Sequence, residues 1–171
     1  VPASTFMVFA MHNQLHPAIR AYLLGMVDLR LGDVGAAGGG ARMLEVMGAS
    51  EGGLVGSLGA ELKARIARAE GKAEGALALL ERSQPDIWFQ LTVASPFFSL
   101  ASRRFLHAEL LLELGRGEEA SGWYAAIAER SPYELIYAAP AQRRLAEIYR
   151  AAGDGERAAV HARRAAELWE T

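Results

Sequence analysis

The sequence predicts an all-α fold built from about four helical hairpins, and three features support this prediction. Apolar residues recur every three or four positions, as in an amphipathic helix; one such stripe is Leu106, Leu110, Leu111 and Leu114. Prolines stand where a helix could begin or between the periodic stretches, at Pro17, Pro85, Pro96, Pro132 and Pro140. A short glycine turn recurs four times along the chain.

The recurring turn combines a glycine with small residues at fixed distances. Its glycines are Gly32, Gly71, Gly115 and Gly153. An alanine follows each glycine after five positions, at Ala37, Ala76, Ala120 and Ala158, and a small residue precedes it by seven, at Gly25, Ala64, Ala108 and Ala146. A glycine with a positive φ angle can end one helix and let the next return antiparallel, and small facing residues let the helices approach closely. Each turn therefore predicts a tight helical hairpin.

The turns divide the chain into one domain of four repeats and an insert. The expected repeats cover about residues 18–49, 50–84, 97–132 and 139–171, and the insert covers 85–96. We expect Trp88 and Phe89 of the insert to pack in the core, or else to anchor a partner. Three consecutive glycines, 38–40, lie in the second helix of the first repeat. Because each costs a helix about 1 kcal/mol relative to alanine, we expect this helix to fray first.

This pattern of a small residue, a glycine turn and an alanine resembles the tetratricopeptide repeat (TPR) over about residues 18–171. Apolar positions of that family are partly matched, by Leu24, Tyr124, Pro132, Leu145 and Tyr149. Successive turn glycines are 39, 44 and 38 residues apart, against about 34 in the family, so helices or connections are longer here. The resemblance implies a right-handed α-solenoid that acts as a protein-interaction module.

The last third of the chain carries a second resemblance. Ser131 to Pro140, continued by residues 144–149 and by Glu167 to Glu170, looks like the TPR segments at the carboxyl end of some bacterial multidomain Ser/Thr kinases and regulators. This resemblance implies a segment of a larger bacterial regulatory protein with a role in signalling. The sequence itself contains no kinase motif.

The TPR resemblance also implies where a partner would bind. In that family, side chains three, six and ten positions before each turn glycine line a concave groove. The corresponding residues are Tyr22, Met26, Leu29, Glu61, Arg65, Arg68, Phe105, Glu109, Leu112, Arg143, Glu147 and Arg150. We expect a protein or peptide partner with both apolar and charged side chains. The alternative is that these residues pack against neighbours or pair among themselves. The Asn and Lys residues with which some TPR modules hold a carboxylate tail are missing from these positions.

A second hypothesis is self-association. Leu168 and Trp169 lie at the end of the last expected helix, and no polar closing helix follows them in this sequence. The C-terminal helix could then join copies of the chain into a homo-oligomeric scaffold.

One pentapeptide matches a catalytic motif. Gly48-Ala-Ser-Glu-Gly52 fits the G-x-S-x-G pattern of a serine-hydrolase nucleophile elbow, in which a strand leads into a strained turn before a helix. Residues 41–47 instead continue a helical pattern, so we expect Ser50 to cap the next helix or to lie in the turn before it. A hydrolase that uses Ser50 is the less favoured alternative, and we expect no catalytic residue and no enzymatic activity.

Other patterns give no cofactor or metal site. Gly71-Lys72 lacks the glycine spacing and the preceding strand of a phosphate loop. The four histidines are His12, His16, His107 and His161. His12 and His16 are four positions apart, but we expect Pro17 to keep that stretch from being helical, and we expect His107 to lie in the core. We therefore expect neither a metal nor a cofactor.

Charge and hydropathy give no sign of a nucleic-acid or membrane partner. The net charge is −2, with eight basic and eight acidic residues in 1–83 and ten and twelve in 84–171. The arginine pairs at 103–104, 143–144 and 163–164 have glutamates within reach, which favours salt-bridged surfaces. No run of 18 apolar residues and no signal peptide occurs, so we expect a cytoplasmic chain. Because it begins with Val1-Pro2, we also expect it to be a piece of a longer protein.

Overall fold

The structure is a computed structural model that describes residues 3–51, 53–83, 96–127, 129 and 133–170. The side chains of 3–14, 49–51 and 96 lie outside the description, as do Trp88 and Phe89 of the insert and the boundary prolines Pro85 and Pro132. Every regular element in the described part is a helix, and none is a strand, which confirms the all-α prediction.

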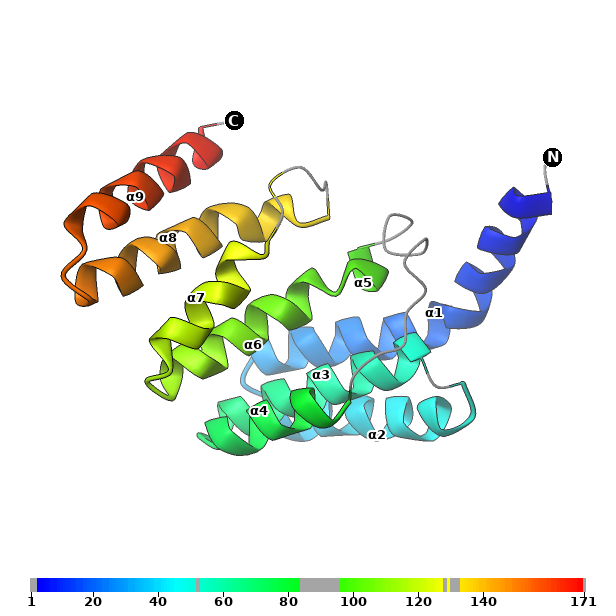
Figure 1. Cartoon of the computed structure of the whole chain (residues 1–171). Coiled ribbons are helices and arrows are strands. Elements are labelled where there is room, and N and C mark those ends of the chain that lie inside the picture. Colours follow the sequence, from blue (N-terminus) through cyan, green and yellow to red (C-terminus); the bar gives the residue numbers. More distant parts are fainter. Residues whose placement is uncertain (1–2, 52, 84–95, 128, 130–132, 171) are drawn as a thin grey trace. The chain divides into compact units, whose positions relative to one another are not determined.

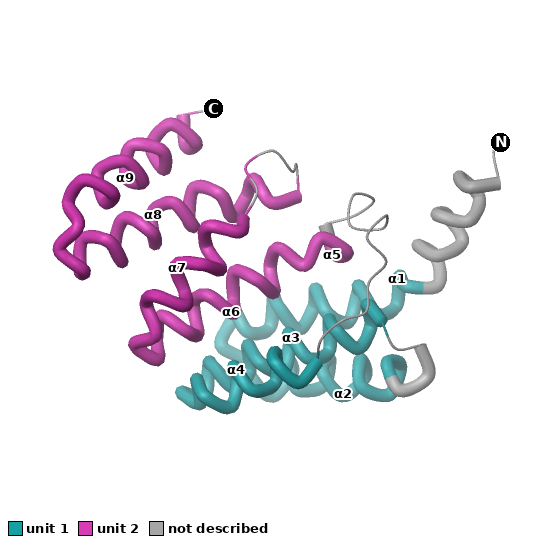
Figure 2. Tube along the Cα trace, in the orientation of Figure 1, with its two compact units in different colours: residues 1–86 teal, residues 87–171 magenta. Residues whose placement is uncertain are grey.

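The chain forms two compact units, Val1–Asp86 and Ile87–Thr171, with their boundary inside the expected insert (Figure 2). The first unit contains α1 (Ala3–Arg30), α2 (Val34–Glu51), α3 (Gly53–Ala69) and α4 (Ala73–Arg82). The second contains α5 (Pro96–Ser99), α6 (Ala101–Glu113), α7 (Gly117–Ala125), α8 (Leu135–Ala151) and α9 (Gly155–Trp169) (Figure 1). The short helix α5 begins at Pro96, as the sequence predicts.

One turn geometry joins the helices of all four hairpins: α1–α2, α3–α4, α6–α7 and α8–α9. The φ angles at the turn glycines are 81° at Gly32, 76° at Gly71, 75° at Gly115 and 79° at Gly153. In each turn the glycine N–H donates to the carbonyl three positions earlier, and the next N–H donates to the carbonyl five positions before it, over 2.8–3.2 Å. This pair of bonds is a Schellman motif, which satisfies carbonyls that the helix end leaves unpaired. The predicted glycine turns are confirmed.

The small residues around each turn are buried between the helices. Ala37, Ala76 and Ala120 are 0% exposed and Ala158 is 3% exposed. The residues seven positions before the glycines are buried as well, at Gly25, Ala64, Ala108 and Ala146. A larger side chain at these positions would push the two helices of a hairpin apart.

Glycines bring α2 close to both of its neighbours in the first unit. A Cβ atom added to Gly40 would lie 3.0 Å from the carbonyl oxygen of Ala21 in α1, and one added to Gly48 would lie 3.2 Å from the Cα of Gly56 in α3. The glycines at 38–40 form part of the continuous helix α2, and of the three, Gly40 packs closely on α1. Early fraying of this helix stays a prediction.

Two of the prolines do not mark helix boundaries. Pro17 lies inside α1 and Pro140 lies inside α8, so the expected interruptions at these positions are wrong. A proline within a helix removes one backbone hydrogen bond and crowds the preceding turn, at a cost of about 3 kcal/mol. Both prolines are followed by a buried alanine, Ala18 at 0% and Ala141 at 1% exposure.

Replacing Gly115 with alanine should lower the free energy of unfolding by about 1–2 kcal/mol, because a Cβ is strained at the positive φ of this turn. Gly122→Ala is the matched control, since Gly122 lies in α7 with no atom within 4 Å of an added Cβ. This control should stabilise the protein by about 0.5–1 kcal/mol. Urea unfolding followed by circular dichroism measures both. Equal effects of the two substitutions would contradict the turn assignment.

Candidate functional site

Three of the predicted groove residues in the first unit form an internal network. The Tyr22 hydroxyl donates to Oε1 of Glu61 over 2.9 Å, and Arg65 donates to the same oxygen through Nη2 over 2.7 Å and Nε over 3.1 Å. Tyr22 is 5% exposed and Glu61 3%. These hydrogen bonds link α1 to α3. Tyr22 and Glu61 are therefore buried between the two helices and do not line an open groove.

A similar network surrounds Glu109 in the second unit. Its Oε1 accepts from the Tyr124 hydroxyl over 2.6 Å, and its two oxygens accept from Nε and Nη2 of Arg144 over 2.7 and 2.9 Å. Arg144 also donates to Glu147 over 2.8 Å. Hydrogen bonds to Glu109, and then to Glu147, raise the pKa of Arg144 above its ordinary value. One buried carboxylate thus joins α6, α7 and α8.

The other predicted groove residues are half-buried or exposed. Half-buried positions are Met26, Leu29, Arg68, Phe105, Leu112 and Glu147, and the exposed ones are Arg143 and Arg150. Phe105 packs on Tyr124 and Tyr137, with ring centroids 5.6 and 5.3 Å away. Arg143 lies 3.7 Å from Glu147. A role of these residues in partner binding stays a prediction.

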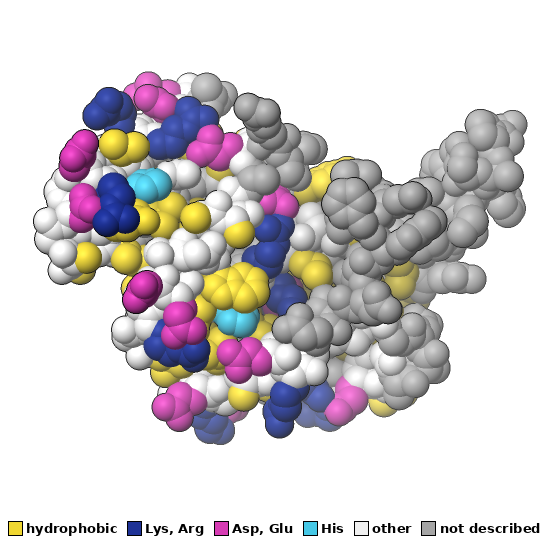
Figure 3. All heavy atoms as spheres, in the orientation of Figure 1, with side chains coloured by type: hydrophobic (Ala, Val, Ile, Leu, Met, Phe, Trp, Pro, Cys, Tyr) yellow, Lys and Arg dark blue, Asp and Glu magenta, His cyan; other side chains and the backbone are white. Residues whose placement is uncertain are grey.

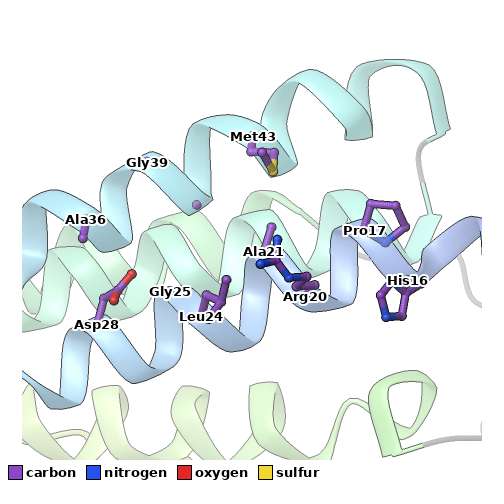
Figure 4. A pocket seen from close by; sticks show the side chains of 11 residues that line it. His16, Pro17, Arg20, Ala21, Leu24, Gly25, Asp28, Ala36, Gly39 and Met43 are labelled. Carbon is purple, nitrogen blue, oxygen red and sulfur yellow. The ribbon is translucent and has the colours of Figure 1, made fainter.

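The structure contains a groove that the sequence did not predict, between α1 and α2 of the first unit (Figure 4). Its volume is about 520 Å³. Its floor consists of alanines and glycines from both helices: Ala21, Gly25, Ala36, Gly39 and Gly40. Because these residues have little or no side chain, the groove stays open although the helices touch below it. We call it the α1–α2 groove.

Exposed apolar side chains edge this groove and continue along α1. Leu24 of α1 and Met43 of α2 line it and are 48% and 55% exposed. Val27 and Leu31 extend the row along α1 and are 51% and 78% exposed. Residues 24, 27 and 31 follow helical spacing and lie on one face. An exposed apolar row is one feature of the surfaces at which proteins associate.

Two opposite charges line the α1 side of the groove. Arg20 and Asp28 stand four positions before and after Leu24, about 12 Å apart along the helix. Within the residues that the structure describes, neither forms an ion pair. Figure 4 shows both on the edge of α1 that faces α2. The groove therefore offers an apolar centre between a positive and a negative end.

Ser50 lies in the last turn of α2, which begins at Val34. The motif is thus preceded by a helix, where a nucleophile elbow has a strand. Ser50 was expected to lie in the turn before the next helix or to cap that helix. This expectation is wrong, because the backbone of Ser50 is part of α2 and α3 begins three residues later, at Gly53.

The histidines are placed in two different ways. His12 and His16 both lie in α1, so the expected break between them does not occur. His107 is 9% exposed and stacks on Trp123 with ring centroids 4.1 Å apart, which confirms a core position. His161 stacks on Tyr149, and its Nδ1 lies 2.6 Å from Oε1 of Gln142. Each of these last two rings has a structural partner.

The predicted pairing of arginines with a glutamate of the same helix holds for Arg144 with Glu147 and for Arg164 with Glu167. It does not describe residues 103–104, because Arg103 is only 7% exposed and so does not lie on a solvated face. Arg164 contacts Glu129 over 2.6 Å and Glu167 over 2.9 Å, and its hydrogen bond lowers the pKa of Glu129. Arg104 pairs with Glu134. Over α8 and α9, basic and acidic side chains alternate on the face shown in Figure 3. Such an alternating surface produces no extended positive field.

Comparison of the chain with protein-family models, with curated proteins and with solved structures gives no match. Across the described ranges, no helix combines the length and the apolar character that crossing a membrane requires. A functional assignment therefore has to come from the geometry of the chain itself.

Replacing Glu109 with alanine should destabilise the protein by about 2–3 kcal/mol, because Tyr124 would lose this acceptor and Arg144 would keep only Glu147. The loss stays below the cost for a fully buried pair, since the Arg144 side chain is 30% exposed and can be partly hydrated. Glu147→Ala is the control: it removes a 40% exposed partner of the same arginine and should cost less than about 1 kcal/mol. Thermal unfolding of both variants tests this, and a larger effect at Glu147 would refute it.

Proposed function

We propose that this chain is a non-catalytic protein-interaction module, a right-handed α-solenoid of four TPR-like hairpins, which binds an amphipathic helix in the α1–α2 groove. The observation that carries the proposal is the groove itself, with its glycine floor and its exposed apolar edge. The helix-binding role is the one expected from the sequence, but its site is the α1–α2 groove and not the concave groove of the TPR family.

The four matching Schellman turns support the repeat architecture. Each hairpin buries small residues at the same two positions relative to its glycine. Repetition of one supersecondary unit is the design of solenoids, whose extended surfaces bind peptides and helices.

The chemistry of the groove indicates what its partner looks like. Full burial of a leucine or methionine side chain contributes about 1.5–3 kcal/mol, so covering the half-exposed Leu24 and Met43 would contribute roughly half of that for each. A helix with apolar residues three and four positions apart provides this cover. An acidic side chain near Arg20 and a basic one near Asp28 would complete the match.

Self-association through α9 has weaker support. Val160 and Trp169 are the large apolar residues that α9 exposes, at 53% and 71%. They are nine positions apart, which places them about 180° apart around the helix. The two side chains therefore do not form one contiguous patch, unlike the row along α1.

Selection of helical peptides from a phage-displayed library of amphipathic sequences tests the proposal. We expect Met43→Glu, at the groove edge, to weaken binding of the selected peptides by about tenfold or more in fluorescence anisotropy. Val160→Glu is the matched control, because Val160 is 53% exposed against 55% for Met43 and lies in the other unit. Failure to select any helical peptide, or equal loss in both variants, would overturn the proposal.

A further inference from the structure

The pattern of charges along α1 points to a specific occupant of the groove. Building on the proposed use of the α1–α2 groove, we propose that it receives α1 of a second copy of this chain. The two α1 helices run antiparallel about a two-fold axis that passes beside Leu24. The interface is therefore isologous, with the same residues contributed by both copies.

Charge complementarity argues for this arrangement. In an antiparallel pair centred on Leu24, each residue meets the one equally far on the other side of position 24. Arg20 of one copy then faces Asp28 of the second copy, and the pairing occurs twice because of the symmetry. Both residues line the groove, and within the described residues neither has an ion-pair partner. The same helix thus carries both the positive and the negative side chain that this pairing requires.

The apolar side chains obey the same symmetry. Leu24, which is 48% exposed, lies at the axis and meets its own copy. Leu31, which is 78% exposed, stands seven positions after Leu24 and meets the exposed Pro17, seven positions before it. The pairing covers these apolar groups from both sides, and burying them provides the attraction that exposed charge pairs alone cannot supply.

The floor of the groove provides the room that a second helix needs. Gly39 of α2, which has no side chain, lines the groove together with Leu24 of α1 (Figure 4). Because Gly40 already packs on Ala21 at the base of the groove, side chains of the second copy would occupy the space of about 520 Å³ above that contact. Packed helices normally keep their axes about 8–10 Å apart, and small residues permit the closer end of that range.

The expected dimer is weak and forms at high protein concentration. The contact runs from Pro17 to Leu31, which is about 21 Å of helix. One such helix pair with its groove buries less than the about 800 Å² per partner of a standard interface, so we expect a transient dimer with a micromolar or weaker dissociation constant.

Charge reversal gives a direct test by sedimentation velocity over a concentration series up to the millimolar range. Arg20→Asp alone, and Asp28→Arg alone, each set like charges against each other twice, so each should weaken dimerisation by about tenfold. A mixture of the two single variants restores both pairings across a heterodimer. The mixture should associate like the wild type, as should the doubly substituted chain.

The matched control reverses an arginine on another side of the same helix. Arg30→Asp makes the same change of charge at an exposed position six residues from Leu24, about 120° around α1, and should dimerise like the wild type. Circular dichroism of every variant checks that the fold is retained. Because residues 20, 28 and 30 are exposed or half-buried, we expect unchanged spectra.

A monomer throughout the series would overturn the inference, as would a dimer that is insensitive to both reversals or is not recovered by mixing. These outcomes differ from failure of the proposed function. A monomeric chain that still binds helical peptides in a Met43-dependent way would mean that the groove takes a foreign helix. A dimer that is disrupted by the single reversals and restored by mixing would support the second copy as occupant.

Discussion

The left-handed backbone at four glycines is the constraint on which the rest of the structure depends. At φ angles of 75–81° a glycine ends one helix, and the Schellman bonds direct the chain into the next. The returning helix lies close to the first only because alanines and glycines occupy the facing positions. Within each unit, larger apolar side chains such as Leu44, Leu62 and Leu110 are buried around these close contacts.

Each unit also contains a buried glutamate that accepts hydrogen bonds from a tyrosine and an arginine. In the first, a buried glutamate accepts from a tyrosine on α1 and from an arginine of its own helix α3. In the second, the carboxylate on α6 receives a tyrosine from α7 and an arginine from α8. A buried ion pair contributes little net stability over an apolar replacement, but it penalises wrong registers strongly because an unpaired buried charge is costly. The networks are well suited to fixing how helices align.

Features that depend on local sequence, such as the glycine turns, could be predicted. Features that depend on contacts with neighbouring helices could not. Glycine turns and their small partners are readable because the need for a positive φ and close contact leaves few alternatives. Pro17 and Pro140 suggested interruptions, yet α1 and α8 run through them, each with a buried alanine at the next position. Glu61 and Glu109 suggested a surface, since nothing local reveals that a tyrosine and an arginine meet each of them. The α1–α2 groove was missed because Gly39 and Gly40 indicated a weak helix.

Replacement of Gly115 by D-alanine through chemical ligation tests the glycine constraint most directly. A D-residue favours positive φ, so the account predicts that D-alanine raises the free energy of unfolding by about 0.5–1 kcal/mol relative to glycine, because it restricts the unfolded chain without straining the turn. An L-alanine ligated at the same position serves as the mirror-image reference and should destabilise. If D-alanine destabilised the protein as much as L-alanine, the left-handed turn could not be what shapes the hairpins.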